Sequence, residues 1–186
     1  MRQLAILAAF AVLAGCKPPP TDEGLDRELP AEPVQFASEP LPSPDTEGAI
    51  WVRSNTAQRI SYGVPGHQAV LAITCLSDSN PPRLRITRNS PADKGAGALL
   101  ALVGNGAIGR LPVDATEIAE KSVWRGEVLA ADSALEPLAG PRQLTATIPG
   151  AGMVTINPST LPMQFLSACR ESETLTENLS AAESAD

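Results

Sequence analysis

Short apolar segments, separated by Gly, Pro, Asn and Asp, follow one another along the chain from residue 48 to residue 170. Their length of four to seven residues and their content of Val, Ile and Thr are typical of β-strands. In residues 83–88 polar and apolar side chains alternate, as they do in a strand with one buried face. The predicted strands lie at residues 69–75, 83–88, 98–103, 124–130, 144–148 and 153–156.

Turn signals connect some of these strands. Asn105-Gly106, between two apolar runs, predicts a tight type I′ hairpin, and the Gly- and Pro-containing residues 149–152 predict a second hairpin. The pattern therefore predicts a mostly β (α+β) domain: a small antiparallel sheet or a sandwich-like domain, closed by a C-terminal helix.

Helix signals are few. Ser133 with Glu136 three positions later predicts a single helical turn that ends near Gly140. Asp114 with Glu117 gives a weaker signal of the same kind.

The longest predicted helix covers residues 161–170, with Thr160 as its cap. Leu161, Phe165 and Cys169 are spaced four residues apart, so they share one helix face. We expect this face to point into the core.

The first sixteen residues carry an export signal. Arg2 precedes an apolar run of ten residues, 4–13, which is too short to span the hydrocarbon of a bilayer. The run ends in Leu13-Ala14-Gly15-Cys16, which resembles the lipobox of bacterial lipoproteins. The resemblance implies cleavage after residue 15 and attachment of diacylglyceryl and N-acyl chains to Cys16, and Lys17 implies the outer rather than the inner membrane. An ordinary secretory signal with a chance cysteine is the alternative.

Composition divides the chain after residue 15 into three parts. Residues 16–47 hold the lipidated cysteine and a Pro-rich linker with eight acids against two bases, which we expect to be disordered. Residues 48–170 form the folded domain, with eleven Lys or Arg against eight Asp or Glu. Residues 171–186, with five acids and no base, read as a disordered acidic tail. The net charge of -7 thus belongs to the flanks, and the domain is mildly basic.

Cys75 and Cys169 remain once Cys16 carries lipid. An even pair of cysteines in an oxidising compartment predicts a disulfide bond. The bond would join a strand to the C-terminal helix and close a long loop, which contributes about 4–5 kcal/mol in the chain-entropy model. A catalytic or metal-binding thiol is the alternative, but it needs histidines or further thiols nearby.

Motifs for catalysis or cofactor binding are weak. Residues 104–109 match G-x-G-x-x-G, but Pro112 follows where that pattern needs a helix, so we expect a hairpin and no nucleotide cofactor. His67, the only histidine, lies in a Pro-Gly turn and cannot complete a zinc site with a bridged cysteine pair. Among the acids of the domain, only Glu127 lies inside a predicted strand. We therefore expect no cofactor, metal, nucleic-acid partner or enzymatic activity.

Arg83, Arg85 and Arg88 form the densest basic run of the domain. Arg83 and Arg85 should project from the same strand face, where they could meet an anionic partner such as a lipid headgroup, a polysaccharide or an acidic protein. The alternatives are a solvated face or charges that keep an edge strand soluble. Trp51, at the junction of linker and domain, is expected to pack in the core, with partner binding as the alternative.

Three functional hypotheses remain. The first is a membrane-anchored, non-enzymatic envelope lipoprotein whose domain binds another protein or an envelope polymer. The second is an inhibitor of a periplasmic or host hydrolase, which needs a rigid exposed loop such as residues 65–68 or 78–83. The third is a hydrolase with an unrecognised site. A broad apolar patch favours the first, and a pocket with convergent polar groups favours the third.

Replacing Cys16 by Ser should abolish incorporation of labelled palmitate and release the protein from the membrane fraction, because the acyl chains supply the anchoring free energy. Metabolic labelling followed by fractionation measures both effects. Cys75→Ser is the matched control and should stay labelled. Recovery of unlabelled wild-type protein among cytosolic enzymes would contradict the lipoprotein assignment.

Overall fold

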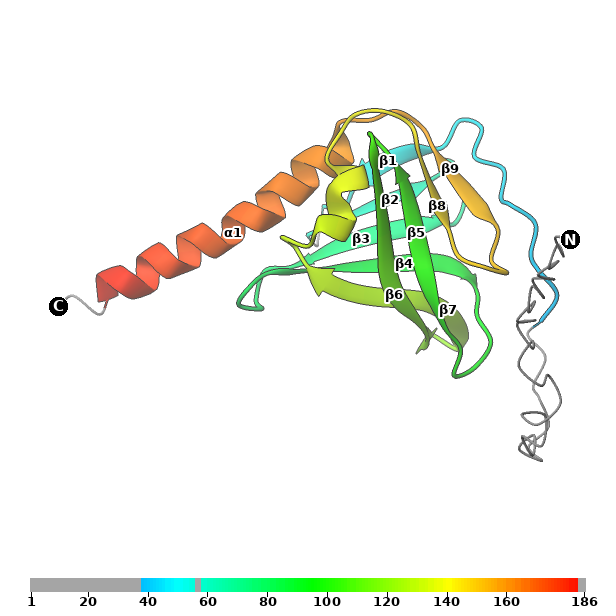
Figure 1. The fold of residues 1–186 in the computed structure, drawn as a ribbon, viewed down its shortest axis with the longest axis horizontal. Coiled ribbons are helices and arrows are strands. Elements are labelled where there is room, and N and C mark those ends of the chain that lie inside the picture. The colour runs from blue at the N-terminus through cyan, green and yellow to red at the C-terminus, as the bar shows by residue number, and fades with distance from the viewer. Residues whose placement is uncertain (1–37, 56–57, 184–186) are drawn as a thin grey trace, which may run out of the picture. The chain divides into compact units, whose positions relative to one another are not determined.

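The computed structural model describes residues 38–55 and 58–183, with side chains as far as Ser172 in the last helix. All of its strands belong to one antiparallel sheet with the order β1-β2-β3-β4-β7-β6-β5-β8-β9 (Figure 1). The predicted mostly β fold with a C-terminal helix is confirmed. The strands are β1 Ile50–Arg53, β2 Arg59–Gly63, β3 Leu71–Leu76, β4 Arg83–Pro91, β5 Gly97–Gly104, β6 Ala107–Ile118, β7 Lys121–Leu129, β8 Leu144–Thr147 and β9 Met153–Ile156.

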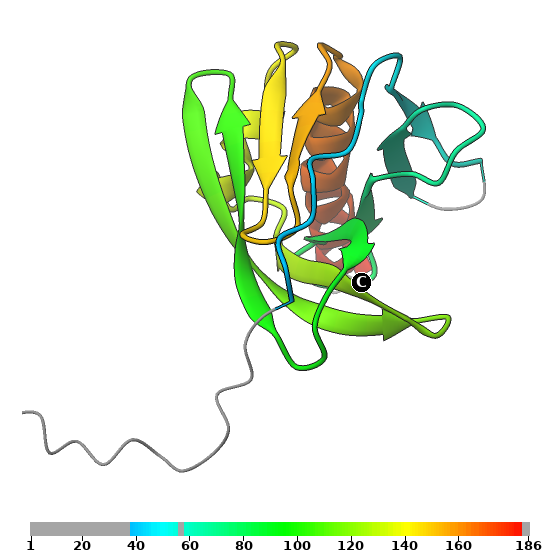
Figure 2. The same cartoon turned by 90° about the vertical axis from the view of Figure 1, so that its right-hand side faces the viewer.

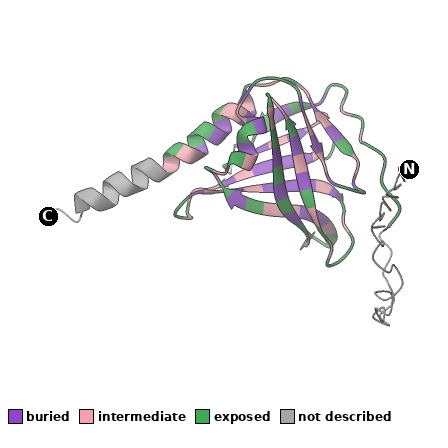
Figure 3. Cartoon of the chain, viewed as in Figure 1, coloured by how far each residue is buried: buried purple, intermediate pink, exposed green. Residues whose placement is uncertain are grey.

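The sheet is curled, so that one face encloses the core and the other faces outward (Figures 1 and 2). Buried and exposed residues alternate along the strands, as the two-residue period of a strand requires (Figure 3). The core is mainly aliphatic, and no single cluster of aromatic rings dominates it. Its fully buried large side chains are Tyr62, Ile60, Leu71, Ile73, Leu84, Leu100, Leu102, Leu111, Leu135, Leu138, Ile148 and Ile156.

Both predicted hairpins are confirmed. β5 and β6 are joined by Asn105 and Gly106 alone, and both residues have positive φ, 51° and 83°, as a type I′ turn needs. Residues 104–109 therefore run from strand to strand, without the helix that a dinucleotide site needs. Gly109 serves packing instead, because a Cβ there would lie 1.8 Å from the carbonyl oxygen of Ala134.

The long strand β6 was not predicted, and the expectation of a helical turn at Asp114 and Glu117 is wrong. Both acids lie in β6, in register with β7. Pro112 within β6 lacks a backbone N–H. Counted from the Gly104–Ala107 pair that closes the hairpin, its pair with Leu99 of β5 is a non-hydrogen-bonded one, and β6 pairs with β7 only from Asp114 onward, so no ladder bond is lost at the proline. The short strands β1 and β2 also went unpredicted.

The helical turn near residue 133 exists as the 3₁₀ helix η1, Ser133–Leu138. Its cap is Asp132, whose carboxylate accepts from Ala134 N at 2.8 Å, and not Ser133 as predicted. Thr160 occupies the cap position of the last helix as predicted, because its carbonyl accepts from Gln164 N at 3.0 Å. The side chain that accepts from the first turn is that of Ser159, whose Oγ accepts from Leu161 N at 3.2 Å.

The last helix, α1, runs from Leu161 to Glu183 and so extends through most of the region expected to be a disordered tail. Helix-forming Glu, Leu and Ala continue past residue 170, and neither Gly nor Pro ends the helix there. Phe165, Leu166 and Cys169 are buried against the sheet. Among the described residues, no helix is long and apolar enough to cross a membrane.

The predicted disulfide is confirmed. Cys75 in β3 and Cys169 in α1 are bonded, with their Cα atoms 5.8 Å apart. The two cysteines lie 94 positions apart in the chain. The bond therefore fixes the first turns of α1 against a strand from the N-terminal half of the domain.

The folded region begins earlier than the predicted boundary at residue 48. Residues 38–47, here called the strap, lie along the edge of β9 (Figure 2). Leu41 N donates to Gly150 O at 2.8 Å, and Met153 N donates to Ser43 Oγ at 3.0 Å. The strap thus supplies a partner for Met153 N at the edge of β9 and for Gly150 O in the turn before it. The predicted export signal, the predicted lipidation site at Cys16 and residues 17–37 lie outside the described residues.

The two edge strands, β1 and β9, do not pair with each other, so side chains close the sheet. Tyr62 Oη in β2 donates to Thr155 O in β9 at 3.1 Å and accepts from Asn157 N at 3.0 Å. Asn157 Nδ2 donates in turn to Ala49 O at 2.9 Å, just before β1. Burial raises the pKa of Tyr62, so the hydroxyl stays a proton donor.

Replacing Tyr62 by Phe should destabilise the fold by about 1–3 kcal/mol, because Thr155 O and Asn157 N would lose their shared partner while they stay partly buried. Urea unfolding measures the change as a lower midpoint at constant slope. Ser167→Ala, which removes an exposed hydroxyl on α1, should leave the midpoint nearly unchanged. Equal midpoints for Tyr62→Phe and wild type would show that this closure contributes nothing.

Candidate functional site

Four arginines share the outer face of the sheet on β2, β4 and β7. Alternation along β4 sends Arg83 and Arg85 outward, while Leu84 and Ile86 between and after them are buried. The register sets Arg59 opposite Thr74 and Thr74 opposite Arg85, so these side chains form one row across three strands. This arginine face consists of Arg59, Arg83, Arg85 and Arg125.

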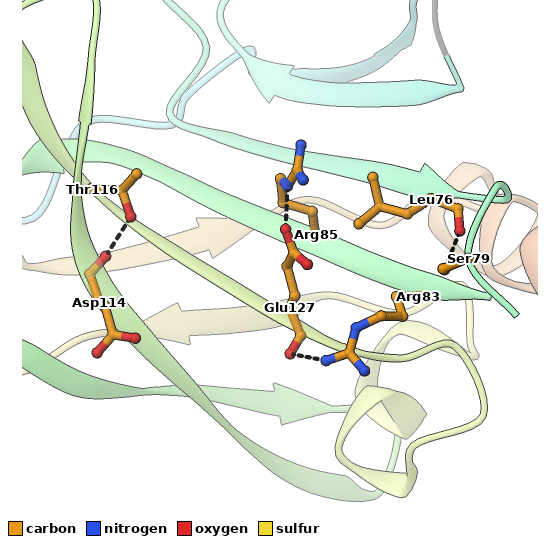
Figure 4. Close-up of polar contacts among 7 residues, drawn as sticks. All are labelled: Leu76, Ser79, Arg83, Arg85, Asp114, Thr116 and Glu127. Atoms are coloured by element: carbon orange, nitrogen blue, oxygen red, sulfur yellow. Dashed lines mark hydrogen bonds and ion pairs between the residues drawn. The ribbon is translucent and has the colours of Figure 1, made fainter. Parts of the chain in front are cut away.

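One carboxylate is engaged on the arginine face. Arg85 Nε donates to Glu127 Oε1 at 2.6 Å, and Arg83 Nη2 donates to the backbone carbonyl of Glu127 at 3.1 Å (Figure 4). Asp114 lies opposite Arg125 in the β6–β7 register, but no ion pair joins them in the described chain. Positive charge is therefore in excess on this face.

The pKa of Arg125 reflects both its burial and this excess of positive charge. Its Nε is buried and has no hydrogen-bond partner among the described residues. Burial lowers the pKa of Arg125, the positive charge of Arg85 lowers it further, Glu127 raises it, and Arg59 lowers it. The positive charges of these arginines repel one another. An anion bound on this face would offset that repulsion and would be attracted by several guanidinium groups at once.

An apolar strip adjoins the arginine face on β5 and β6. Its residues point outward: Leu99 is 50% exposed, Val103 43% and Ile108 60%, and Val103 lies directly opposite Ile108. Pro112, opposite Leu99, continues the strip toward β7. The backbone of β7 passes close to this proline: a Cβ added to Gly126 would lie 2.1 Å from Pro112 O.

Two residues predicted as candidates for partner binding lie in the interior. Arg88 is 4% exposed, because it is three positions from Arg85 and so lies on the opposite strand face. Its guanidinium donates to Val70 O at 3.1 Å and to Ala151 O at 3.2 Å. Trp51 is 8% exposed and packs against Tyr62 with 5.2 Å between ring centroids, which confirms core packing.

The strand order also excludes one alternative predicted for Arg83 and Arg85, that their charges keep an edge strand soluble. β4 lies between β3 and β7 and is paired on both sides, so Arg83 and Arg85 do not protect a sheet edge. Sequence reasoning missed Arg59, Arg125 and the apolar strip. Isolated arginines and a run such as residues 98–103 give no sign of which neighbours they will have across the sheet.

The features expected of the other hypotheses do not come together in the described residues. Glu127 lies on the outer face beside Arg85 rather than in a pocket. His67 is exposed and borders a cavity of about 340 Å³ with Asp45 and Glu47, but no cysteine or serine joins it there. The candidate inhibitory loops, residues 65–68 and 78–83, fall in the short connections β2–β3 and β3–β4, and Arg83 already belongs to β4.

No group of three or more His, Cys, Asp or Glu side chains in the described ranges could hold a metal ion. No family model, curated protein or solved structure matches the chain. Function is therefore inferred from the geometry of the surface.

The arginine face should contribute little to stability, because exposed ion pairs are worth about 0–1 kcal/mol. Arg85→Gln should therefore lower the free energy of unfolding by less than about 1 kcal/mol, measured by urea unfolding. Arg88→Leu is the comparison: it leaves the carbonyls of Val70 and Ala151 without their donor and should cost about 1–3 kcal/mol. A loss of unfolding free energy in Arg85→Gln as large as that in Arg88→Leu would show that Arg85 stabilises the fold.

Proposed function

We propose that this chain is a membrane-anchored, non-enzymatic envelope lipoprotein whose domain binds another protein through the arginine face and the apolar strip. The observation that carries the proposal is the excess of guanidinium groups on central strands, where they do not protect an edge. The strip of exposed Leu99, Val103 and Ile108 lies on the neighbouring strands of the same outer face.

The combination of the two surfaces favours a protein partner over a polyanionic polymer. Protein interfaces typically contain an apolar centre, enriched arginine and a polar rim. An anionic glycan would form ionic contacts with the arginines but would gain little binding free energy from Ile108 and Val103. The partner surface should therefore be acidic beside an apolar patch, which also increases the association rate at low salt.

The anchoring part of the proposal rests on the lipobox resemblance at Cys16. Lipid attachment there would hold the domain at an envelope membrane, with the outer membrane favoured by Lys17. The strap, which starts at Ser38 and reaches the sheet through Asp93, would connect the anchor to the domain. Tethering raises the local concentration of the domain for any partner in the same compartment.

Reversal of charge on the arginine face should abolish partner binding. A photo-crosslinking amino acid at Thr74, which lies between Arg59 and Arg85, is expected to give a discrete crosslinked species in envelope membranes. Arg59→Glu with Arg85→Glu should remove that species, because both changes place repulsive charge against an acidic partner. Lys94→Glu with Arg142→Glu makes the same charge change at exposed positions elsewhere and should leave the crosslink intact.

Ile108→Asp tests the apolar strip in the same assay and should weaken the crosslink at least as strongly as one charge reversal. Urea unfolding of each variant checks that the fold is kept. Loss of the crosslink with the arginine variants but not with Ile108→Asp would indicate a polymer and overturn the protein interface. An unchanged crosslink in the arginine variants would overturn the proposal altogether.

A further inference from the structure

The two edges of the sheet, β1 and β9, are protected to different degrees (Figure 1). The strap lies along β9 and has prolines at positions 40, 42 and 44. β1 contains no proline, and its described edge is bonded only at the start, where Asn157 Nδ2 donates to Ala49 O. Proteins normally protect an exposed strand edge with prolines, charges or a covering segment. An edge without such protection is suited to pairing with another strand.

The backbone groups of Trp51 and Arg53 face this edge. Ser54 N donates to Arg59 O at 2.9 Å, which makes these two residues a hydrogen-bonded pair. Hydrogen-bonded and non-hydrogen-bonded pairs alternate along an antiparallel ladder, so Val52 bonds to β2, whereas Trp51 and Arg53 do not. The N–H and C=O groups of Trp51 and Arg53 therefore point away from β2, and none has a partner among the described residues. They are the groups that a further strand would bond.

A hollow of about 200 Å³ lies on the outer face beside β1. Its lining includes Ile50 and Val52, which are 50% and 53% exposed, and residues 64–67 of the β2–β3 connection. When a peptide adds a strand to a sheet, main-chain hydrogen bonds supply affinity and pockets for alternate side chains supply specificity. Neighbours across a ladder share a face, so an apolar side chain paired with Val52 would enter this hollow.

The charges around β1 differ between its two ends. Arg53 is exposed at the end of the strand, and Arg59 of the arginine face lies next to it on β2. The guanidinium of Arg53 lies 5.7 Å from the centre of the Phe165 ring, and no described hydrogen bond joins α1 to the backbone of β1. Asp45 and Glu47 precede the start of β1. An acidic side chain on a paired segment would thus be attracted beside Arg53 and repelled at the start of the strand.

We propose that an extended, acidic segment of the protein partner adds a strand to the edge of β1, with an apolar side chain in the hollow and a carboxylate beside Arg53. The inference rests on the proposed function, because it assigns the segment to the partner that binds the arginine face. That face begins on β2, next to β1, so the two surfaces are continuous. A second copy of this chain fits less well, since pairing of β1 with its counterpart would bring two arginine faces into one sheet, where their charges repel.

Arg53→Pro tests the strand pairing. Proline is tolerated on edge strands, and the N–H of residue 53 does not bond β2, so urea unfolding should show a stably folded variant. The crosslink from Thr74 in envelope membranes should fall about tenfold, because one ladder bond is lost. Arg53→Gln is the matched control: it removes the charge but keeps the N–H, and the crosslink should fall less. Equal crosslinks in the two variants would overturn the strand pairing.

A photo-crosslinking amino acid at Val52 tests the identity of the occupant. The expected product contains the same partner as the product from Thr74, because the two positions would contact one protein. A product with the mass of two copies of this chain would assign the edge to a second copy and overturn the proposal.

A peptide assay separates failure of this inference from failure of the proposed function. Fluorescein-labelled Glu-Val-Glu-Val-Glu-Val should bind the purified full-length protein saturably, measured by fluorescence anisotropy. The lysine version of the peptide should bind about tenfold more weakly, because Arg53 repels it. N-methylation of all glutamates or of all valines should weaken binding in only one of the two peptides, because alternate N–H groups of an added strand face β1.

The results divide as follows between the two proposals. Peptide binding of this pattern without a Thr74 crosslink in the wild type would overturn the proposed function and leave the strand site. A Thr74 crosslink with no saturable peptide binding, or with equal binding of both methylated peptides, would overturn the strand site alone. Equal binding of the glutamate and lysine peptides would overturn the acidic character of the segment.

Discussion

The structure depends on closing a sheet whose two edge strands do not meet in a backbone ladder. A curled sheet that stays open has two edges with unpaired N–H and C=O groups, and such edges promote association with other chains. In this protein the Tyr62 hydroxyl and the Asn157 amide connect β2 and the segment before β1 to β9. Each of these bonds joins residues more than ninety positions apart, so closure requires the whole domain to be folded.

Two further devices reinforce the closure. The strap covers β9 with prolines at positions 40, 42 and 44, which have no N–H to attract another strand. The Cys75–Cys169 bond holds α1 to β3, and Phe165 and Leu166 then complete the core from the open side.

The distribution of charge follows from the same geometry. β4 contributes to both sides of the sheet: Arg85 to the outer face and Arg88 to the interior. Outside, Arg85 is the one arginine of this face that forms an ion pair among the described residues, which suits recognition of an acidic surface better than it suits stability. Inside, the guanidinium of Arg88 is held by the backbone carbonyls of Val70 and Ala151. One strand therefore supplies an arginine to the candidate binding surface and another to the interior.

The sequence alone determined the features that depend on local chemistry. Apolar runs with β-branched residues gave six of the strands, Asn105-Gly106 gave a hairpin because both positions need positive φ, and two domain cysteines gave the disulfide. The sequence reasoning failed for β6, where the Asp114–Glu117 spacing suggested a helical turn, because the pairing of both acids with β7 is a long-range contact that the spacing does not encode. Only the tertiary structure decided which arginines lie together and what covers β9. Strand order and curl bring Arg59, Arg85 and Arg125 to one face and the strap to one edge, and no local pattern encodes a contact between residues so far apart in the chain.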